Sequence, residues 1–413
     1  MAGGLVGSEI LKIAADIRAM VAEGQTVCNL TVGDFNPVEF RIPEFLEQDI
    51  TRQYQKGQTN YPPSDGVMEL RKAVQQFYSE WLHLQYPEKS IIVTGGARPV
   101  IYGIYRAVVD PGEKVVYPTP SWNNNHYVHM VGAKGVAVPC SVRTSFLPTR
   151  DLLKDAIRDA VLLSLNSPLN PTGTAFTREA LEGICDLVLE ENRRRGKGAK
   201  PLYVMYDQVY WMLTFGKTDH YNPVSLRPEM APYVIFVDAI SKSFAATGVR
   251  VGWSVGPQDV IERMSAILGH VGAWAPRAEQ LASSELLLRS GEIIKYHQSM
   301  KAGVQSRLEL LYKSLMAMKS AGLTVNAIEP MGAIYLTAQF DLIGKNRPGG
   351  GVFSTNEDIR QYLLHEAQVA VVPFQAFAHA EQSGWFRLSV GAVSLNDIET
   401  MAPKLKTALE KIK

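Results

Sequence analysis

A lysine with an arginine eight positions further along is the arrangement in this chain that best suits covalent chemistry. Lys242 follows the apolar run 233–237 and begins a turn of small residues that leads to Arg250. The apolar run predicts a buried strand, and ligands of open α/β sheets bind outside the carboxyl ends of such strands. A lysine partly removed from water there has a lowered pKa, so its amine can form a Schiff base with a carbonyl compound. Taken alone, however, Lys242 is better interpreted as an ordinary solvated lysine.

Two further apolar runs end in polar residues that complement the amine. One run is followed by a segment that contains Asn170, and another by Asp207 and Tyr210. Pyridoxal 5′-phosphate needs such a set: a lysine for its aldehyde, a carboxylate that keeps its ring nitrogen protonated, and donors for its phenolic oxygen. We therefore predict that Lys242, Asp207 and Tyr210 are catalytic, with Asn170 and Tyr210 at the phenolic oxygen.

A glycine pair provides a candidate phosphate site. Gly95 and Gly96 follow the apolar run 91–94, and Ala97 opens a helical pattern. Small residues allow backbone N–H groups to approach an anion at the positive end of a helix dipole. A Gly-Gly turn is weak evidence by itself, but together with Lys242 and Arg250 it favours a phosphate.

Three motifs give the chain a resemblance to a known family. They are N-P-T-G at 170–173, D-x-x-Y at 207–210 and S-K-x-x-x-x-x-G-x-R at 241–250. In their order and spacing the chain resembles the class I and II pyridoxal-phosphate-dependent aminotransferases, the aspartate aminotransferase-like superfamily of fold type I. Further similarity lies in residues 30–37, 61–71 and 385–389.

The resemblance implies a role for each candidate site residue. The cofactor is expected to contact the backbone of Gly96, Ala97 and Arg98, the ring of Trp122, and the side chains of Asn170, Asp207, Tyr210, Ser241, Lys242 and Arg250. Tyr61 is expected to reach the cofactor phosphate of a neighbouring subunit in a homodimer. The substrate is expected to contact Gly33, Asn170 and Arg387, since a guanidinium forms a bidentate pair with a carboxylate.

The chain departs from the family pattern at two places. Ala239 stands where many relatives have a serine that touches the phosphate, and Ser241 lies beside the lysine instead. Arg277 either recognises a second substrate carboxylate or is an exposed arginine at the start of a helix. His126 and His129 complete no metal-binding pattern, so we expect no metal site there.

The alternation of helical and strand patterns predicts an α/β fold. We expect a mostly parallel central sheet with helices on both faces, and a smaller α+β domain formed by the two chain ends. The expected divisions are 1–45 as an N-terminal arm and part of the small domain, 46–295 as the large cofactor-binding domain, and 296–413 as the rest of the small domain.

Individual elements follow from hydrophobic periodicity. Ser8 can cap a helix that continues to about Ala22, with an apolar stripe at Ile10, Leu11, Ile13, Ala14, Ile17 and Val21. Strands are predicted at 91–94, 114–117, 161–165, 202–206, 233–237, 334–336, 369–372 and 386–390, and a long helical stretch at about 278–321.

Composition excludes some functions. The 413 residues are 46% hydrophobic and 20% charged with a net charge of +1, so no global field attracts nucleic acid or an anionic membrane. Cys28, Cys140 and Cys185 show no metal or redox spacing, and we expect free thiols. The first residues lack the basic flank and apolar core of a signal peptide, and no apolar stretch is long enough to span a bilayer. These features predict a cytoplasmic enzyme.

The function expected from the resemblance is transfer of the amino group of an L-amino acid to a 2-oxo acid through a Schiff base of pyridoxal phosphate on Lys242. A lyase of the same fold, such as a carbon-sulfur β-lyase, shares nearly every motif and remains an alternative. A non-catalytic binding or regulatory protein is a second alternative, against which the intact Lys242, Asp207 and Arg250 argue. The donor and acceptor are not specified by these motifs.

Overall fold

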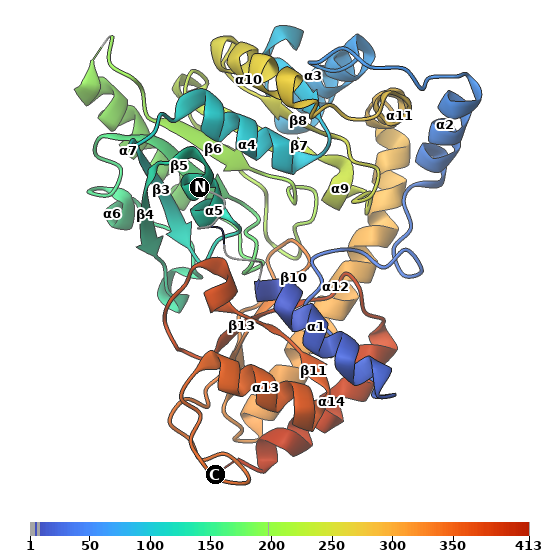
Figure 1. Cartoon of the computed structure of the whole chain (residues 1–413), viewed down its shortest axis with the longest axis vertical. Helices are drawn as coiled ribbons and strands as arrows, with labels where there is room; N and C mark the ends of the chain where they lie inside the picture. The colour runs from blue at the N-terminus through green and yellow to red at the C-terminus, as the bar shows by residue number, and fades with distance from the viewer. Residues whose placement is uncertain (1–4, 6–8, 197, 413) are drawn as a thin grey trace.

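A seven-stranded sheet forms the centre of the upper part of the molecule (Figure 1). The computed structural model describes residues 5, 9–196 and 198–412. The strands lie in the order β2 (Ile91–Thr94), β8 (Gly252–Val255), β7 (Val234–Ala239), β6 (Tyr203–Asp207), β5 (Ala160–Asn166), β3 (Lys114–Thr119) and β4 (Lys134–Pro139). All pairs are parallel except those of β8, which runs antiparallel to both neighbours. The other six strands therefore end at one common edge.

Helices cover both faces of this sheet. One face packs on α4 (Ala97–Val108) and α10 (Gln258–Val271), the other on α3 (Met68–Leu82), α7 (Arg178–Arg195) and α11 (Arg277–Leu287). The strands are apolar on both faces because each face is buried, which is typical of parallel sheets. The remaining helices of this part are α2 (Glu44–Gln55), α5 (Asn124–Val131), α6 (Arg150–Leu153), α8 (Pro223–Leu226) and α9 (Ile240–Ser243).

A smaller antiparallel sheet lies in the lower part of Figure 1. Its order is β12 (Val372–Pro373), β13 (Trp385–Ser389), β10 (Tyr335–Phe340) and β9 (Val325–Ala327), and a two-stranded sheet pairs β1 (Cys28–Asn29) with β11 (Val369–Ala370). The helices here are α1 (Glu9–Ala22), α13 (Asn356–Ala367) and α14 (Leu395–Glu410). The helix α12 (Ser290–Ser320) runs down from the upper part into this lower part.

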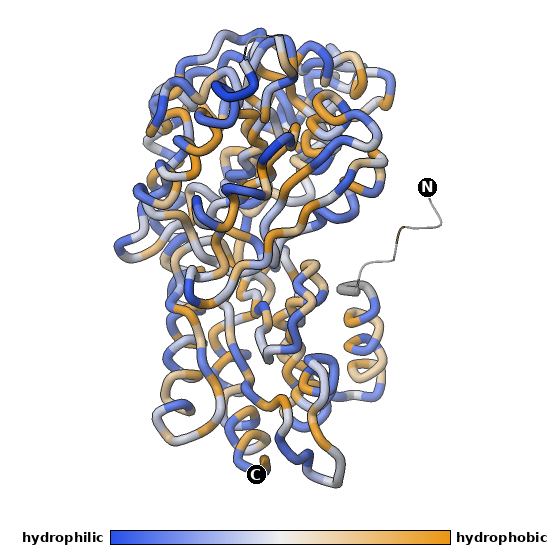
Figure 2. The backbone as a smooth tube through the Cα atoms, turned by 90° about the vertical axis from the view of Figure 1, so that its left-hand side faces the viewer, coloured by the Kyte–Doolittle hydropathy of each residue, from blue (hydrophilic) through white to orange (hydrophobic). Residues whose placement is uncertain are grey.

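The first helix packs on the outside of the lower part, as the side view of Figure 2 shows. Ile13, Ile17 and Met20 bury their side chains in a cluster that includes Phe374 and Trp385. This burial fastens the N-terminal segment to residues near the other end of the chain.

The fold class is as predicted, and several elements differ in detail. The stretch 278–321 is two helices, α11 and α12, separated at Leu288 and Arg289, since periodicity alone does not show a break between two amphipathic segments. Val21 is 55% exposed and lies outside the apolar stripe. The predicted cap Ser8 and the side chains of Ile10 and Leu11 lie outside the described residues.

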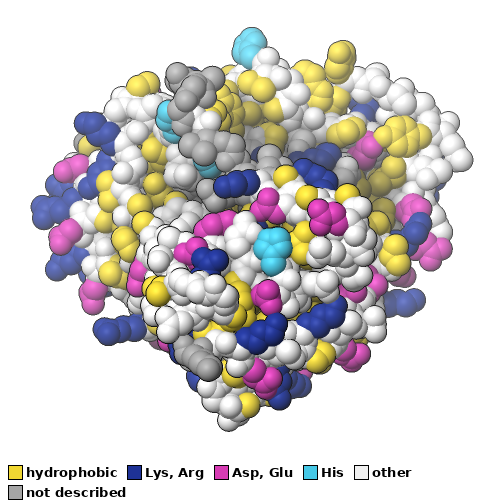
Figure 3. Space-filling model, turned by 60° about the horizontal axis from the view of Figure 1, so that its bottom comes forward, with side chains coloured by type: hydrophobic (Ala, Val, Ile, Leu, Met, Phe, Trp, Pro, Cys, Tyr) yellow, Lys and Arg dark blue, Asp and Glu magenta, His cyan; other side chains and the backbone are white. Residues whose placement is uncertain are grey.

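The surface and the cysteines agree with the composition. On the face seen in Figure 3, basic and acidic side chains are interspersed. Cys28, Cys140 and Cys185 are free thiols, as predicted. None of the helices that the described residues form is long and apolar enough to cross a bilayer.

Candidate active site

Lys242 lies at the carboxyl edge of the large sheet, on the short helix α9 that follows β7. Its Nζ donates a hydrogen bond to the carbonyl oxygen of Gly33 at 2.5 Å. The ring centroids of Phe35 and Tyr210 lie 6.0 Å and 5.9 Å from the same Nζ. A segment near the N-terminus therefore covers the lysine from the side of the smaller sheet.

The amine of Lys242 is made less basic by its surroundings. Burial, together with the positive charges of Arg387, Arg98 and Arg250, lowers its pKa to about 8, although the negative charge of Asp34 opposes this shift. Burial disfavours the charged form of an amine, so an appreciable neutral fraction exists near pH 8. A neutral amine is the form that attacks a carbonyl carbon.

Asp207 is the last residue of β6, which is next to β7 in the sheet order. Its Oδ1 accepts a hydrogen bond from the Val209 amide at 3.2 Å, and no cationic side chain of the described residues pairs with it. Burial raises its pKa to about 7. A carboxylate in this environment is stabilised by a cationic N–H group, such as a protonated ring nitrogen.

Tyr210 hydrogen-bonds across the gap between the two sheets. Its hydroxyl lies 2.6 Å from the hydroxyl of Tyr335 on β10. Burial raises the pKa of both phenols, so both remain neutral at physiological pH. Sequence reasoning did not identify Tyr335, because no motif marks it.

Arg387 is a buried arginine on β13 with no acidic partner among the described residues, and it is 1% exposed. It donates from Nη2 to the Thr31 carbonyl oxygen at 2.6 Å and from Nη1 to Asn170 Oδ1 at 3.2 Å, while its Nε has no partner. Its Cζ lies 4.7 Å from the ring centroid of Tyr335 and 4.9 Å from that of Phe377. Burying an unpaired guanidinium is unfavourable, so this position suits a carboxylate ligand.

Gly33 lies between the lysine and the arginine. A Cβ added to it would come within 3.0 Å of the Tyr335 hydroxyl and 3.7 Å of Arg387 Nη1. Any side chain at this position would therefore occupy the space beside the guanidinium, which explains why a glycine stands here.

The glycine pair after β2 packs directly against Arg250. Gly96 has φ +95°, and a Cβ on it would overlap the Arg250 guanidinium. Arg250 donates to the carbonyl oxygens of Thr247 and Gly95, each at 2.8 Å. The N-terminus of α4 and this guanidinium thus form one positively charged corner that suits a phosphate.

Gly252 supports the same corner from β8. A Cβ there would lie 2.8 Å from the backbone nitrogen of Ala97, so only a glycine allows the strand to pack this closely. Sequence reasoning missed this role, although the spacing of Gly252 from Arg250 was a usable signal.

Two further predicted cofactor contacts are Ser241 and Trp122. Ser241 and Ala239 are buried at α9, and Ala239 forms the N-terminal boundary of that helix. The Cζ of Arg98 lies 5.6 Å from the ring centroid of Trp122, and the ring centroids of Trp122 and Phe377 are 6.2 Å apart.

The side chain of Tyr61 does not belong to the group of residues around Lys242. It is 81% exposed and packs edge-on against Trp274 at 5.7 Å. Both rings line a surface hollow of about 530 Å³ together with Arg277. Arg277 is the first residue of α11, is half-buried, and donates from Nε to Gln58 Oε1 at 2.8 Å.

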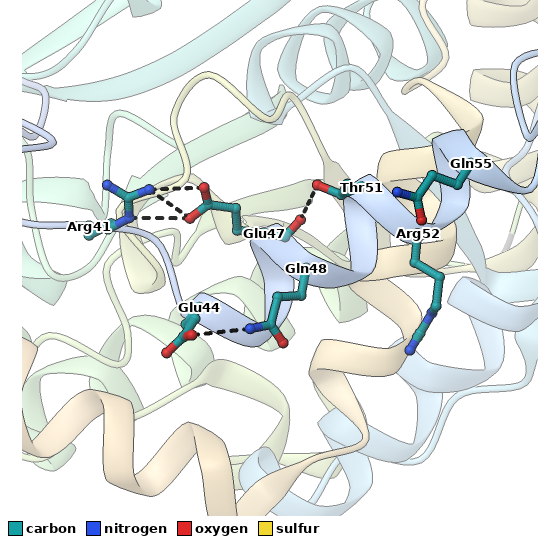
Figure 4. A pocket seen from close by; sticks show the side chains of 7 residues that line it. All are labelled: Arg41, Glu44, Glu47, Gln48, Thr51, Arg52 and Gln55. Carbon is teal, nitrogen blue, oxygen red and sulfur yellow. Dashed lines mark hydrogen bonds and ion pairs between the residues drawn. The ribbon is translucent and has the colours of Figure 1, made fainter.

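A separate hollow of about 580 Å³ lies along α2 (Figure 4). Its charged side chains have partners: Arg41 pairs with Glu47 at 2.9 Å, Gln48 donates to Glu44 at 3.1 Å, and Arg52 pairs with Asp49 at 2.6 Å. These side chains satisfy each other, so this hollow has no unpartnered reactive group comparable with Lys242 or Arg387.

The chemistry of the group around Lys242 fits pyridoxal phosphate and an amino acid. The site combines an amine with a lowered pKa, a carboxyl that no described cation pairs with, and a guanidinium that no described carboxylate pairs with. The cofactor presents the matching groups, namely an aldehyde, a protonated ring nitrogen and a phosphate, and an amino acid presents the carboxylate.

Comparison with known proteins gives the same result. The family model for aminotransferase class I and II matches residues 25–405. An aspartate aminotransferase of Rhizobium meliloti (strain 1021) is 30% identical over 408 residues, covering 98% of this chain and 92% of that protein. Another from Bacillus sp. (strain YM-2) is 29% identical, covering 96% and 94%.

Solved structures agree over the whole chain. The aspartate aminotransferase of Rhizobium meliloti superposes with a TM-score of 0.90 at 27% identity, covering 100% of this chain and 98% of that one. An aromatic aminotransferase from Pyrococcus horikoshii OT3 gives 0.83 at 27% identity, covering 96% and 99%. These matches favour amino transfer over the lyase alternative. The chain belongs to the class I and II aminotransferases and is a pyridoxal-phosphate-dependent enzyme that transfers the amino group of an amino acid to a 2-oxo acid.

Proposed function

We propose that Lys242 is both the anchor for the cofactor and the group that moves the proton at the substrate Cα. The observation that carries this proposal is the meeting of an amine and a guanidinium at Gly33: Lys242 Nζ bonds its carbonyl oxygen, and Arg387 lies beside its Cα. An α-amino acid needs both groups, one near its Cα and one at its carboxylate. With a pKa of about 8, Lys242 can accept and return a proton near neutral pH.

Asp207 and Tyr210 adjust the reactivity of the cofactor in this proposal. The bound cofactor supplies a carbonyl that exchanges amines and a ring that withdraws electrons from the substrate. Asp207 holds the proton on the ring nitrogen, since its carboxyl accepts from the Val209 amide and pairs with no cation in the described part of the chain. The hydroxyl of Tyr210 and the amide of Asn170 donate to the phenolic oxygen.

The phosphate and the ring are held by groups at the sheet edge. Backbone N–H groups of Gly96, Ala97 and Arg98 bind the phosphate at the start of α4, and Arg250 pairs with its oxygens. Ser241 donates from its position beside Lys242, and Trp122 stacks on the ring. Gly33, Asn170 and Arg387 bind the substrate, with Arg387 on the α-carboxylate.

The amino donor that we propose is a dicarboxylic L-amino acid such as aspartate. The relatives cited above that are named aspartate aminotransferase support this class. A second carboxylate needs a cation, and Arg277 forms no ion pair among the described residues. Arg277 and Tyr61 line the same hollow, so if Tyr61 serves the neighbouring subunit, Arg277 is presented there as well.

The assembly that we propose is a homodimer in the cytoplasm. The 81% exposure of Tyr61 supports its contact with the cofactor phosphate of the other subunit. The three free cysteines suit a reducing compartment. The division into 1–45, 46–295 and 296–413 is also proposed, and it is supported by the large sheet, which lies wholly between residues 91 and 255.

The test follows the visible absorption of the purified protein loaded with pyridoxal phosphate while L-aspartate is added without any 2-oxo acid. We expect the band of the lysine-bound cofactor to convert to that of the aminated cofactor and to return when a 2-oxo acid is added. Lys242→Ala should abolish the conversion. Lys301→Ala is the matched control, because Lys301 is another partly buried lysine whose pKa is lowered, and it lies on α12 away from Gly33.

Two results would contradict the proposal. Wild-type conversion by Lys242→Ala would remove the lysine from the mechanism. If L-cysteine is supplied in place of aspartate, release of sulfide, ammonia and pyruvate without any 2-oxo acid would instead identify a carbon-sulfur lyase.

A further inference from the structure

A buried carboxyl lies behind the candidate site, on the opposite face of the sheet from Asp207. Asp238 is the next-to-last residue of β7 and is 1% exposed. In the parallel pairing of β6 and β7, Asp207 stands beside Val237. Since successive side chains of a strand point to opposite faces, Asp238 points away from the side that Asp207 occupies. The residue therefore does not contact the cofactor or the substrate directly.

Asp238 accepts hydrogen bonds from Trp211, Tyr78 and Ala239. Its Oδ2 accepts from Trp211 Nε1 at 3.0 Å and from the Tyr78 hydroxyl on α3 at 3.2 Å. Its Oδ1 accepts from the backbone amide of Ala239 at 2.8 Å. Both oxygens are therefore used as acceptors, and no ion pair forms with Asp238 within the part of the chain that the structure describes.

The Tyr78 hydroxyl connects this carboxyl to two further donors. It accepts from Gln208 Nε2 at 3.3 Å and from Trp253 Nε1 at 3.2 Å, so its own proton is directed to Asp238. Trp253 stands directly opposite Asp238 in the antiparallel pairing of β7 with β8. The result is a network of buried polar groups beneath the sheet edge, which continues from Gln208 Oε1 to His220 Nε2 at 3.3 Å.

A carboxyl is a costly choice for a position of this kind. Burial raises the pKa of Asp238 to about 8, because the ionised form is removed from water without a cationic partner. An apolar residue would avoid this cost but would leave three donors without an acceptor, and an amide would offer only one accepting atom. The network thus depends on the two oxygens of Asp238.

The network holds the segment 207–211, which carries two candidate catalytic residues. Asp207 and Tyr210 face the site, whereas Gln208 and Trp211 bond to the network on the other side. Trp211 packs in the hydrophobic cluster beneath the sheet, and Tyr210 packs in the cluster above it. Gln208 and Trp211 thus hold the segment on the side opposite the site, while Asp207 and Tyr210 point into the site.

The same carboxyl holds the start of the segment that carries Lys242. Ala239, whose amide bonds to Asp238, is the N-terminal boundary of α9, and Lys242 comes three residues later. One side chain is thus bonded both to the segment of Asp207 and Tyr210 and to the segment of Lys242.

We propose that Asp238 is a positioning residue that fixes segment 207–211 relative to Lys242 and so sets how the ring nitrogen and the reactive amine are presented to each other. This inference rests on the proposed roles of Asp207, Tyr210 and Lys242. The inference concerns the alignment of the reacting groups. A substitution at a distance from these groups that displaces them by about 1 Å lowers turnover by about 100-fold.

The test uses the full-length enzyme loaded with pyridoxal phosphate and the variant Asp238→Asn. The amide nitrogen cannot accept a hydrogen bond, so either Trp211 and Tyr78 together or Ala239 alone loses its acceptor. We expect kcat to fall by about 10- to 100-fold, while KM for the 2-oxo acid, which depends on Arg387, stays unchanged. We also expect the apparent pKa of the visible band of the lysine-bound cofactor to shift, and the Kd of pyridoxal phosphate to rise.

A matched pair of tryptophan variants separates positioning from stability. Trp211→Phe and Trp253→Phe each remove one indole donor from the same buried network, but only Trp211 belongs to segment 207–211. We expect both to lower Tm. Only Trp211→Phe should shift the pKa of the visible band and lower kcat.

The outcomes distinguish failure of this inference from failure of the proposed function. If Trp253→Phe shifts the band and kcat as much as Trp211→Phe, or if neither does so, the network is only structural and the inference is wrong. The same holds if Asp238→Asn folds and lowers Tm alone. If Asp238→Asn does not fold, the tryptophan pair decides. Failure of the wild-type enzyme to show the lysine-bound band would instead overturn the proposed roles.

Discussion

Replacing Arg387 by lysine tests the carboxylate site most directly. The guanidinium uses two of its donors on Thr31 and Asn170, and Nε is left without a partner. A lysine keeps the charge but cannot present two parallel N–H groups to a carboxylate. Losing one hydrogen bond to a charged group removes about 1.5–3 kcal/mol, so kcat/KM should fall by about 10- to 150-fold.

The assay measures the first half-reaction in single turnover, by the change in visible absorption over a range of amino acid concentrations. Arg360→Lys is the matched control, because Arg360 is also 1% exposed but is already paired with Asp16 and Glu357. We expect Arg360→Lys to lower Tm and to leave the half-reaction unchanged. The effect of Arg387→Lys should appear with amino acids and 2-oxo acids alike, since both carry the α-carboxylate.

An unchanged KM for both substrates in Arg387→Lys would refute the reasoning. It would mean that the unpaired guanidinium is a packing feature between Tyr335 and Phe377, and that the carboxylate binds elsewhere. A loss shared equally by Arg360→Lys would show that any change at a buried arginine disturbs the enzyme, and the specific assignment would also fail.

Three further predictions follow from the same site. Gly96→Ala should weaken cofactor binding by at least about 10-fold, since a Cβ there overlaps Arg250. Fluorescence titration measures the Kd of the cofactor. The control is Gly349→Ala, which should leave this Kd unchanged because Gly349 has a similar φ of +91° and open space around it. In the cofactor-free protein the pKa of Asp207 is raised to about 7, so its contribution to stability is complete below pH 4 and is lost as the pH rises through 7. Thermal melts from pH 5 to 8 should therefore show a smaller decline of Tm for Asp207→Asn than for the wild-type protein. Arg277→Gln should raise KM for a dicarboxylic donor by about 10-fold and leave KM for a monocarboxylic donor unchanged, and equal KM changes for both would exclude a contact with the second carboxylate.

The sequence predicted the large sheet well because its strands are short apolar runs buried on both faces. The predicted runs 91–94 and 114–117 correspond to β2 and β3, and the ends of β5, β6 and β7 carry the residues expected there. β8 and β4 were not identified. β8 lies between glycines and has a tryptophan and a serine, and β4 is largely exposed, so neither shows a continuous apolar run.

The candidate site was predictable where a motif fixes spacing along the chain. Lys242 and Arg250 lie eight residues apart in one short segment, so their spacing is readable from sequence alone. Tyr335 and Asp238 were not found, because their importance arises from hydrogen bonds between elements that are distant in the chain. A tyrosine in a strand and an aspartate at a strand end are common, and only the fold shows which groups they meet.

Several charged groups of this enzyme are buried in an arrangement that the protein alone does not satisfy. Among the residues that the structure describes, Arg387 has no anionic partner and Asp207 has no cationic partner, and Lys242 is surrounded mainly by other positive charges. Each of these groups makes the cofactor-free fold less stable, since burial of an unpaired charge is unfavourable. The cofactor and substrate bring the missing partners, so the same groups favour binding. A ligand that binds only the folded state stabilises that state by RT ln(1 + [L]/Kd), so retention of the cofactor is linked to the stability of the fold. Apolar replacements at these positions should therefore stabilise the empty protein while removing its activity.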